Sequence, residues 1–282
     1  MSLGTSRIND EFSSELPVIR TLAIILIVLS VSACQTTRET QRNNIGSNST
    51  SAPPKGGFDK KNAAEKRVGM GLTYINAQNY KRAKFHLDKA LTYNAKSPNV
   101  HYALGIYFQR VKEYKSAEKH FKRALSIDSK RPEFYNAYGA FLCEKGDYKD
   151  AEKMFNRAID IPTYTDVASA FYNVGFCALK QNQIDKAAEY FRKSLNRDRR
   201  RADALIEMAK IEFSKERYAR ALQYVRRYEQ TRTTSESAWL GLKAAHFLRD
   251  KDAIARYGII LEQRFPDSEE TAEYLDNKKR WM

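Results

Sequence analysis

The amino-acid sequence predicts an all-α solenoid built from about six helix-turn-helix units and closed by a C-terminal capping helix. The main reason is that two sets of small residues recur with the same period. Gly71, Gly105 and Gly139 are spaced by 34 residues, and Gly175 follows 36 residues later. A series of alanines has the same spacing, including the step of 36: Ala83, Ala117, Ala151, Ala187 and Ala221. The shared two-residue excess places one insertion between the third and fourth units, in the turn at residues 162–165.

Larger side chains keep fixed positions around the small residues of each unit. In the second unit the pattern positions are His101, Leu104, Gly105, Phe108, Ala117, Phe121 and Ala124. In the third unit they are Tyr135, Tyr138, Gly139, Leu142, Ala151, Phe155 and Ala158. This pattern and its period of 34 residues resemble the tetratricopeptide repeat, and the resemblance implies a right-handed superhelical solenoid. The first and fourth units follow the pattern closely, whereas the fifth has Ala209 for the glycine and Val225 for the aromatic residue.

Close packing of two antiparallel helices explains the small residues. We expect the glycine of the first helix to lie against the alanine of the second, and the aromatic residues to fill the layer between successive units. A sixth unit around Trp239, Leu242 and residues 253–255 departs from the pattern, so its register is uncertain by about two residues. The units are predicted to span residues 63–265, and residues 266–282 to form the capping helix.

The N-terminal residues have the organisation of a secretory signal. Residues 21–31 read TLAIILIVLSV, an apolar run with the length of a signal-peptide core but too short to span a bilayer. The following Val-Ser-Ala-Cys sequence resembles the bacterial lipobox, which implies cleavage before Cys34 and acylation of that cysteine. Residues 1–33 are thus predicted to be a lipoprotein signal peptide, and residues 34–62 a lipidated N-terminus and flexible polar tether. Gln35, where inner-membrane lipoproteins typically have aspartate, favours the periplasmic face of the outer membrane.

Charge and composition narrow the choice of function. Removing residues 1–33, with two arginines and three carboxylates, raises the formal net charge from +15 to +16. Those carboxylates all precede Leu16, unlike the positive start of a signal peptide, so we expect translation to start near Leu16 or Val18. An exported protein does not meet nucleic acid, so the expected partners of the positive charge are anionic lipid, glycan or an acidic protein surface. The alternative is that the charged surface serves only solubility.

The sequence contains no recognisable catalytic or metal-binding motif. The histidines and cysteines lack the spacing of metal ligands, and neither a phosphate-binding loop nor a nucleophile with its base is recognisable. We therefore predict no enzyme activity, no metal, no small-molecule substrate and no cofactor beyond the covalent lipid. Cys143 and Cys177 lie in neighbouring units, so a disulfide in an oxidising periplasm is conceivable. Packed helix axes are roughly 8 to 10 Å apart and the two positions differ in facing, so we expect unpaired thiols.

Tetratricopeptide proteins bind extended peptides or helices on a concave face lined by the first helix of each unit, and the resemblance implies such a groove here. The positions that carry over are Tyr102, Ile106, Gln109, Arg110, Asn136, Ala140, Tyr172, Asn173, Phe176, Lys180, Ile206, Lys210 and Phe213. We expect Asn136 and Asn173 to pair with a peptide backbone, and Tyr172 and Phe176 to hold apolar side chains. The alternative is that individual rings belong to the core. The family's Lys and Asn clamp for a C-terminal carboxylate is not reproduced, so a free C-terminus is not the expected ligand.

Arginines gather near the junction of the fourth and fifth units: Arg197, Arg199, Arg200, Arg201, Arg226 and Arg227. One interpretation is a solvated loop and helix end. The other is an anionic docking patch that faces lipid phosphate or an acidic partner segment, in a contact that salt weakens.

The lipobox cysteine, the polar tether, the tetratricopeptide units and the C-terminal cap together resemble the PilF/PilW-type pilotins, lipoproteins of type IV pilus biogenesis and stability. The likeness includes residues 135–139 and the pair Tyr172 and Asn173. It implies a pilotin at the periplasmic face of the outer membrane that binds secretin subunits of the type IV pilus and promotes their outer-membrane localisation and multimer assembly. A periplasmic scaffold for peptidoglycan hydrolases, or a factor in outer-membrane protein assembly, has the same parts and stays open as the alternative.

Overall fold

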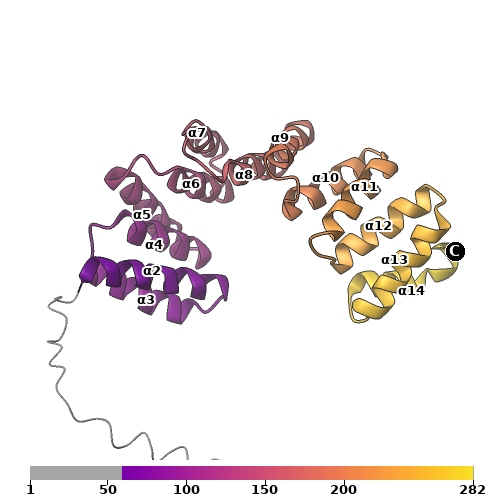
Figure 1. Ribbon diagram of the computed structural model, residues 1–282, viewed down its shortest axis with the longest axis horizontal. Coiled ribbons are helices and arrows are strands. Elements are labelled where there is room, and N and C mark those ends of the chain that lie inside the picture. The colour runs from indigo at the N-terminus through magenta and orange to yellow at the C-terminus, as the bar shows by residue number, and fades with distance from the viewer. Residues whose placement is uncertain (1–58, 282) are drawn as a thin grey trace, which may run out of the picture. The chain divides into compact units, whose positions relative to one another are not determined.

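The computed structural model describes residues 59–281; the predicted signal peptide, Cys34 and nearly the whole tether lie outside the described residues. Within this range the chain forms six antiparallel helix pairs followed by two short helices (Figure 1). The pairs are α2 (Lys60–Asn76) with α3 (Tyr80–Tyr93), α4 (Pro98–Arg110) with α5 (Tyr114–Ile127), α6 (Pro132–Lys145) with α7 (Tyr148–Ile159), α8 (Val167–Lys180) with α9 (Ile184–Arg197), α10 (Ala202–Ser214) with α11 (Tyr218–Glu229), and α12 (Ser235–Phe247) with α13 (Lys251–Arg264). The predicted all-α solenoid of about six units is confirmed. The C-terminal segment is two short helices, α14 (Glu269–Asp276) and α15 (Lys278–Trp281), where the sequence predicted one.

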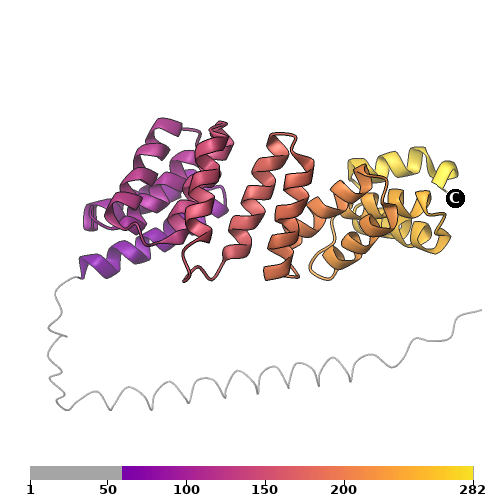
Figure 2. The same ribbon diagram turned by 90° about the horizontal axis from the view of Figure 1, so that it is seen from above.

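The first helices of the pairs follow one another along one face. In the described chain α2 contacts α4, α4 contacts α6, α6 contacts α8 and α10 contacts α12, whereas each second helix contacts the first helix of the next pair. Figures 1 and 2 show this succession of pairs from two directions. We call the face formed by the first helices the inner face and the face formed by the second helices the outer face; in helical-repeat proteins the inner face is concave. No helix in residues 59–281 is long and apolar enough to cross a bilayer.

Helix ends follow from local sequence signals. Pro98 and Pro132 open α4 and α6, where the N–H group that proline lacks has no partner within the helix. The turn inside each pair contains one residue with positive φ, and these residues are Gln78, Lys112, Gly146, Asn182, Glu216 and Arg249. Only Gly146 is a glycine, the residue that adopts this conformation without a steric cost. The turn geometry is therefore imposed by the packing of the two helices on either side.

The glycine in the first helix of a unit accommodates a large side chain from the second helix. These side chains lie 16 residues after their glycines, and in the first four units they are Leu87, Phe121, Phe155 and Phe191. A Cβ atom added at Gly139 would lie only 2.8 Å from ring carbons of Phe155, and 3.2 Å from the Ala151 carbonyl oxygen. Phe155 itself is buried. The glycine therefore lies against the alanine of the second helix, as expected, and its missing Cβ atom also admits the Phe155 ring. In the second unit the equivalent ring, Phe121, packs on Tyr138 and Phe141 of the third unit, so the expected layer of rings between units is confirmed.

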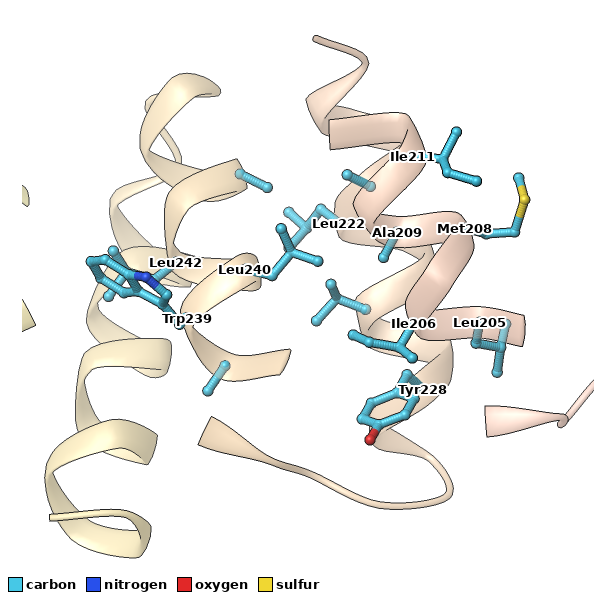
Figure 3. Close-up of a cluster of buried hydrophobic side chains, with 14 of the residues drawn as sticks. Leu205, Ile206, Met208, Ala209, Ile211, Leu222, Tyr228, Trp239, Leu240 and Leu242 are labelled. Atoms are coloured by element: carbon cyan, nitrogen blue, oxygen red, sulfur yellow. The ribbon is translucent and has the colours of Figure 1, made fainter. Parts of the chain in front are cut away.

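The same pairing fixes the register of the two units that depart from the pattern. In the fifth unit the equivalent positions hold Ala209 and Val225, both fully buried in one cluster, so a smaller partner leaves room for the extra methyl group. Figure 3 shows Ala209 within this cluster. In the sixth unit the pair is Gly241 and Tyr257, and a Cβ atom at Gly241 would lie 2.5 Å from the ring. Gly241 does not follow the period of 34 residues, because the step from Ala209 shortens to 32 residues.

The glycine–ring pairing predicts non-additive mutations. Gly139→Ala forces the Phe155 ring to move and should lower the free energy of unfolding by about 1 to 3 kcal/mol. Phe155→Val leaves a cavity and should cost a similar amount or more. The double variant copies Ala209 and Val225, so its loss should fall short of the sum of the single losses by about 1 kcal/mol or more. Urea unfolding of the four proteins measures this coupling, and strictly additive losses would contradict the pairing.

A histidine pair joins α4 to α5 within the second unit. The Nδ1 atoms of His101 and His120 are 3.0 Å apart, and His101 Nε2 lies 3.1 Å from the Ala95 carbonyl oxygen. Burial, and then the proximity of His101, lowers the pKa of His120 to about 4, and burial also lowers the pKa of His101. The folded protein therefore keeps this pair neutral at pH 7.

This pair should make stability depend on pH. The unfolded chain takes up protons near the ordinary histidine pKa of 6.5, whereas folded His120 resists protonation until about pH 4, so stability falls as pH falls between these values. The variant His101→Phe/His120→Tyr copies Phe171 and Tyr190, whose rings pack 6.2 Å apart at the equivalent positions of the fourth unit. Its denaturation midpoint should fall less steeply over that pH range than that of the wild type. Equal slopes would show that the histidines do not contribute.

Candidate functional site

Polar side chains connect neighbouring first helices along the inner face. Asn173 on α8 donates through Nδ2 to Asn136 Oδ1 on α6 at 2.9 Å. Gln109 on α4 donates through Nε2 to Glu144 Oε2 on α6 at 2.6 Å. The predicted positions Asn136, Asn173 and Gln109 thus lie on this face, but they bind their neighbours in the repeat. Among residues 59–281 no side chain donates to Asn173 Oδ1, so this carbonyl oxygen can still accept a hydrogen bond from a peptide.

Two rings and a lysine of α8, with Arg201 from the start of α10, form a cluster of rings and cations on the inner face. Tyr172 and Phe176 stack with their ring centroids 6.1 Å apart. Lys180 Nζ lies 5.5 Å from the centroid of the Phe176 ring, and the Arg201 guanidinium carbon lies 5.3 Å from that of Tyr172. Phe176 is 40% exposed, a large fraction for a phenylalanine on a packed helix. Burial, followed by the charges of two nearby carboxylates, raises the pKa of Tyr172 to about 12, so its phenol stays neutral.

The inner face continues on α10 and α12 with the same combination of rings and lysines. Lys210 Nζ lies 2.6 Å from a Glu236 oxygen on α12 and 3.1 Å from a Glu207 oxygen. Phe213 packs edge-on against Phe247 at the end of α12, with centroids 6.0 Å apart. Phe247 is 56% exposed and was missed by the sequence analysis, because the sixth unit had no fixed register.

Other predicted groove residues serve the core. Ile206 is 6% exposed and belongs to the buried cluster of the fifth and sixth units, so its assignment to the groove is wrong. Its position follows the groove pattern, but it lies where the fifth unit packs on its neighbours. Tyr102 packs on Phe134 with ring centroids 5.0 Å apart, and Ile106 and Ala140 are half-buried against core side chains. The remaining predicted residue, Arg110, is exposed at the end of α4.

The predicted arginine patch divides between the two faces. Arg199, Arg200 and Arg227 line a hollow of about 580 Å³ on the outer face, between the end of α9 and α11. Arg192 of α9 lines it too and was not predicted, because it lies outside the run of arginines at the junction of the two units. We call this site the arginine hollow, and its other lining residues are Leu195, Asn196, Tyr224 and Gln230.

The other three predicted arginines do not line the hollow. Arg201 extends over Tyr172 and lies 3.6 Å from Asp166. Arg226 lies 3.6 Å from Asp250, and Arg197 is an exposed residue at the end of α9.

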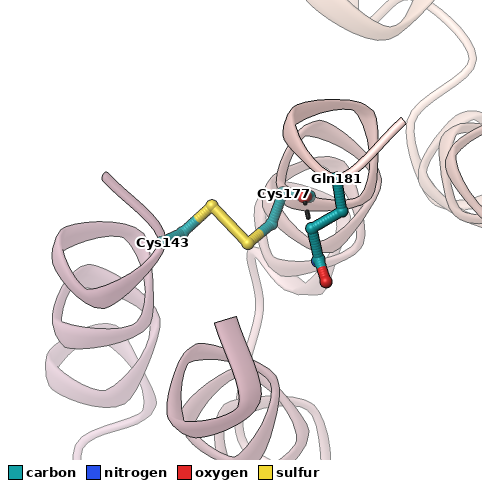
Figure 4. Close-up of a disulfide and its surroundings, with 3 residues drawn as sticks. All are labelled: Cys143, Cys177 and Gln181. Carbon is teal, nitrogen blue, oxygen red and sulfur yellow. Dashed lines mark hydrogen bonds between the residues drawn. A yellow bond between two sulfur atoms is a disulfide. The ribbon is translucent and has the colours of Figure 1, made fainter. Parts of the chain in front are cut away.

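A disulfide joins the third and fourth units, contrary to the expectation of unpaired thiols. Cys143 on α6 and Cys177 on α8 have Cα atoms 5.8 Å apart, and Gln181 donates to the Cys177 carbonyl oxygen at 3.1 Å (Figure 4). The two positions do differ in facing relative to Gly139 and Gly175. Because of that difference, Cys143 lies on the side of α6 that contacts α8, and Cys177 lies on the side of α8 that contacts α6. The distance between helix axes was therefore the wrong criterion, because both residues lie on the line of contact.

Loss of the disulfide should destabilise the protein measurably. The bridge closes a loop with a sequence separation of 34 residues, which corresponds to about 3 to 4 kcal/mol of chain entropy in the unfolded state. The variant Cys143→Ser/Cys177→Ser should lose that amount in denaturant unfolding. Reductant should produce the same loss in the wild type and none in the variant. A wild type whose unfolding ignores reductant would contradict the bridge.

No metal centre can be built from the described residues. Across residues 59–281, no three His, Cys, Asp or Glu side chains are grouped so that they could hold a metal ion. The candidate binding sites are the rings and lysines of the inner face and the arginine hollow of the outer face.

Family models match the repeats over most of the described chain. Models described as tetratricopeptide repeat match residues 131–200, 178–245 and 67–97, and the model of YpiA-like, C-terminal tetratricopeptide repeats matches residues 98–162. The six helix pairs and these matches define the chain as a tetratricopeptide-repeat protein.

Relatives identify the family within this class. The chain is 29% identical over 261 residues to the type IV pilus assembly protein PilF of Pseudomonas aeruginosa PAO1, covering 92% of this chain and 99% of that protein. The solved structure of Pseudomonas aeruginosa PilF matches with a TM-score of 0.65 and 31% identity, over 77% of this chain and 98% of the other. PilW, described as a widely conserved type IV pilus biogenesis factor, matches with a TM-score of 0.64 and 28% identity, over 75% of this chain and 98% of the other. The chain belongs to the PilF/PilW family of type IV pilus biogenesis proteins.

Proposed function

We propose that this protein is a pilotin, anchored by a lipid on Cys34 to the periplasmic face of the outer membrane. It binds secretin subunits of the type IV pilus on its inner face and promotes their localisation and multimer assembly. Membership of the PilF/PilW family supports a role in pilus biogenesis. A fold of stacked repeats, which serves as a binding scaffold, supports a protein partner rather than a substrate for catalysis.

The inner face from α8 to α12 is the observation that carries the proposal. Phe176 and Phe247 are large exposed rings, and Lys180, Lys210 and Lys243 lie close to the rings and carboxylates of this face. Exposed aromatic surface next to fixed cations suits an extended peptide that carries apolar and acidic side chains. The Asn173 side-chain oxygen adds an acceptor for a peptide N–H group.

The disulfide supports the proposed compartment. Structural disulfides persist in the periplasm and outside the cell but are rare in a reducing cytosol. The bridge between Cys143 and Cys177 therefore fits an exported protein. The lipobox-like sequence ending at Cys34 points the same way.

Immunoblots for heat- and detergent-resistant secretin multimers test both the anchor and the binding face. Multimers should disappear from a strain that lacks this protein and return with the wild-type gene. Cys34→Ala should fail to restore them at the outer membrane. Phe176→Ser/Phe247→Ser should reduce them by about tenfold, because two exposed rings are removed from the proposed binding surface.

A matched pair of exposed apolar residues on the outer face provides the control. Phe85 on α3 and Ile259 on α13 are each 54% exposed, close to the exposure of the two rings under test. Phe85→Ser/Ile259→Ser should restore multimers as well as the wild type. Unchanged multimers in the deletion strain would overturn the secretin role and favour a scaffold for peptidoglycan hydrolases or for outer-membrane protein assembly. Equal effects of the two double variants would overturn the assignment to the inner face.

A further inference from the structure

The arginine hollow holds four guanidinium groups that lack ion-pair partners. Within residues 59–281, no carboxylate lies within 4.0 Å of Arg192, Arg199, Arg200 or Arg227, whereas Arg226 in the same helix pair does have an acidic partner. Four like charges around about 580 Å³ repel one another, and this repulsion opposes folding. An anion in the hollow would remove that repulsion.

The hollow is held in its shape by contacts from both sides. Arg227 donates through Nη2 to the Arg199 carbonyl oxygen at 3.0 Å, and its guanidinium carbon lies 5.4 Å from the centroid of the Tyr224 ring. In the loop, Asp198 Oδ1 accepts the Arg200 backbone N–H at 3.0 Å. The side of α11 and the loop after α9 are thus fixed relative to each other before any ligand binds, which lowers the entropy cost of binding.

The turn itself does not require arginines. The equivalent turns before α4 and α6 have the same hydrogen bond: the Lys96 backbone N–H donates to Asn94 Oδ1, and the Lys130 backbone N–H donates to Asp128 Oδ1. At the positions of Arg199 and Arg200 they carry Ala95 with Lys96, and Ser129 with Lys130. The fold is therefore satisfied by small residues and single lysines, and the paired arginines of the fourth junction serve something other than the turn.

A nearby carboxylate does not neutralise the hollow. Glu212 lines a smaller neighbouring hollow of about 240 Å³, which shares Arg192, Tyr224 and Arg227 with the first. Glu212 is 4% exposed, and its Oε2 atom lies 3.6 Å from Arg217, outside the arginine hollow. One buried carboxylate with a partner of its own leaves a net positive charge beside four guanidinium groups.

We infer that the arginine hollow binds a ligand that carries phosphate groups. Guanidinium groups match phosphate oxygens in bidentate geometry, and four of them suit a compact group with two phosphates. An acidic peptide spreads its carboxylates along an extended chain of roughly 3.3 Å per residue, whereas the four guanidinium groups line one hollow. The volume falls within the range of roughly 300 to 1,000 Å³ that is usual for small-ligand sites. The site lies on the outer face and does not depend on the secretin role.

Calorimetric titration of the full-length protein with inorganic pyrophosphate, in a non-ionic detergent, tests this inference. Wild type should bind one pyrophosphate, more weakly as ionic strength rises. Arg199→Gln/Arg200→Gln should weaken binding by about tenfold or more, since each side chain supplies charge-assisted hydrogen bonds. The control Lys96→Gln/Lys130→Gln removes two cations from the equivalent turns and should leave the affinity unchanged. Both double variants lie in exposed turns, and thermal unfolding checks that they remain folded.

Competition distinguishes the source of the phosphate. Displacement of pyrophosphate by detergent micelles with phosphatidylglycerol, but not with phosphatidylcholine, would assign the hollow to anionic lipid headgroups. Resistance to both would assign it to a soluble phosphate compound. Absence of pyrophosphate binding, equal affinity in the two double variants, or tighter binding of a hexaglutamate peptide than of pyrophosphate would each overturn the inference. None of these results depends on secretin multimers, so the proposed function stands or fails separately.

Discussion

The contact between a glycine on the first helix of a unit and a large side chain on the second is the constraint on which the rest of the structure depends. A ring such as Phe155 fits only where Gly139 has no Cβ atom, and the turn that joins the two helices of each pair has one residue at positive φ. Four of the six residues at those positions, Gln78, Lys112, Glu216 and Arg249, are of types that rarely adopt that conformation, so the helix packing must hold them there. In the fifth unit Ala209 on the first helix faces Val225 on the second, so the extra methyl group of the alanine is matched by a smaller partner. The repeat thus keeps a small residue on the first helix against a larger one on the second, and the two sizes adjust to each other.

Periodicity predicted the architecture because spacing alone reveals stacked units. It could not predict features that depend on how one unit packs against the next. The bridge from Cys143 to Cys177 depends on how α6 meets α8, and the step of 32 residues before Gly241 hid the register of the sixth unit and with it Phe247. Ile206 follows the groove pattern but is buried, because the same position can face either a ligand or a neighbouring helix. The hydrogen-bond partner of a polar side chain, such as that of Asn136 or Asn173, can be found only from coordinates. An asparagine can bind a peptide or a neighbouring side chain equally well.

The two faces of the repeat stack carry different chemistry. The inner face from α8 to α12 combines exposed rings with lysines, of which Lys210 already has acidic neighbours, and this suits a chain of mixed apolar and acidic side chains. The outer face has its charge concentrated in the arginine hollow, whose guanidinium groups lack carboxylate partners in the described chain. Because the faces are formed by different helices of each pair, a ligand on one leaves the other accessible. The disulfide lies between α6 and α8 and links the third unit to the fourth unit, which carries the Tyr172 and Phe176 rings.

Site-specific photocrosslinking in living cells tests the binding of secretin to the inner face most directly. Benzoylphenylalanine replaces Phe176 in one protein and Phe85 in another; both positions already hold an exposed ring, so the substitution disturbs packing little. The proposed function predicts an ultraviolet-dependent adduct with the type IV pilus secretin from position 176 and none from position 85. An adduct with secretin only from position 85, or adducts from position 176 only with other proteins, would contradict it.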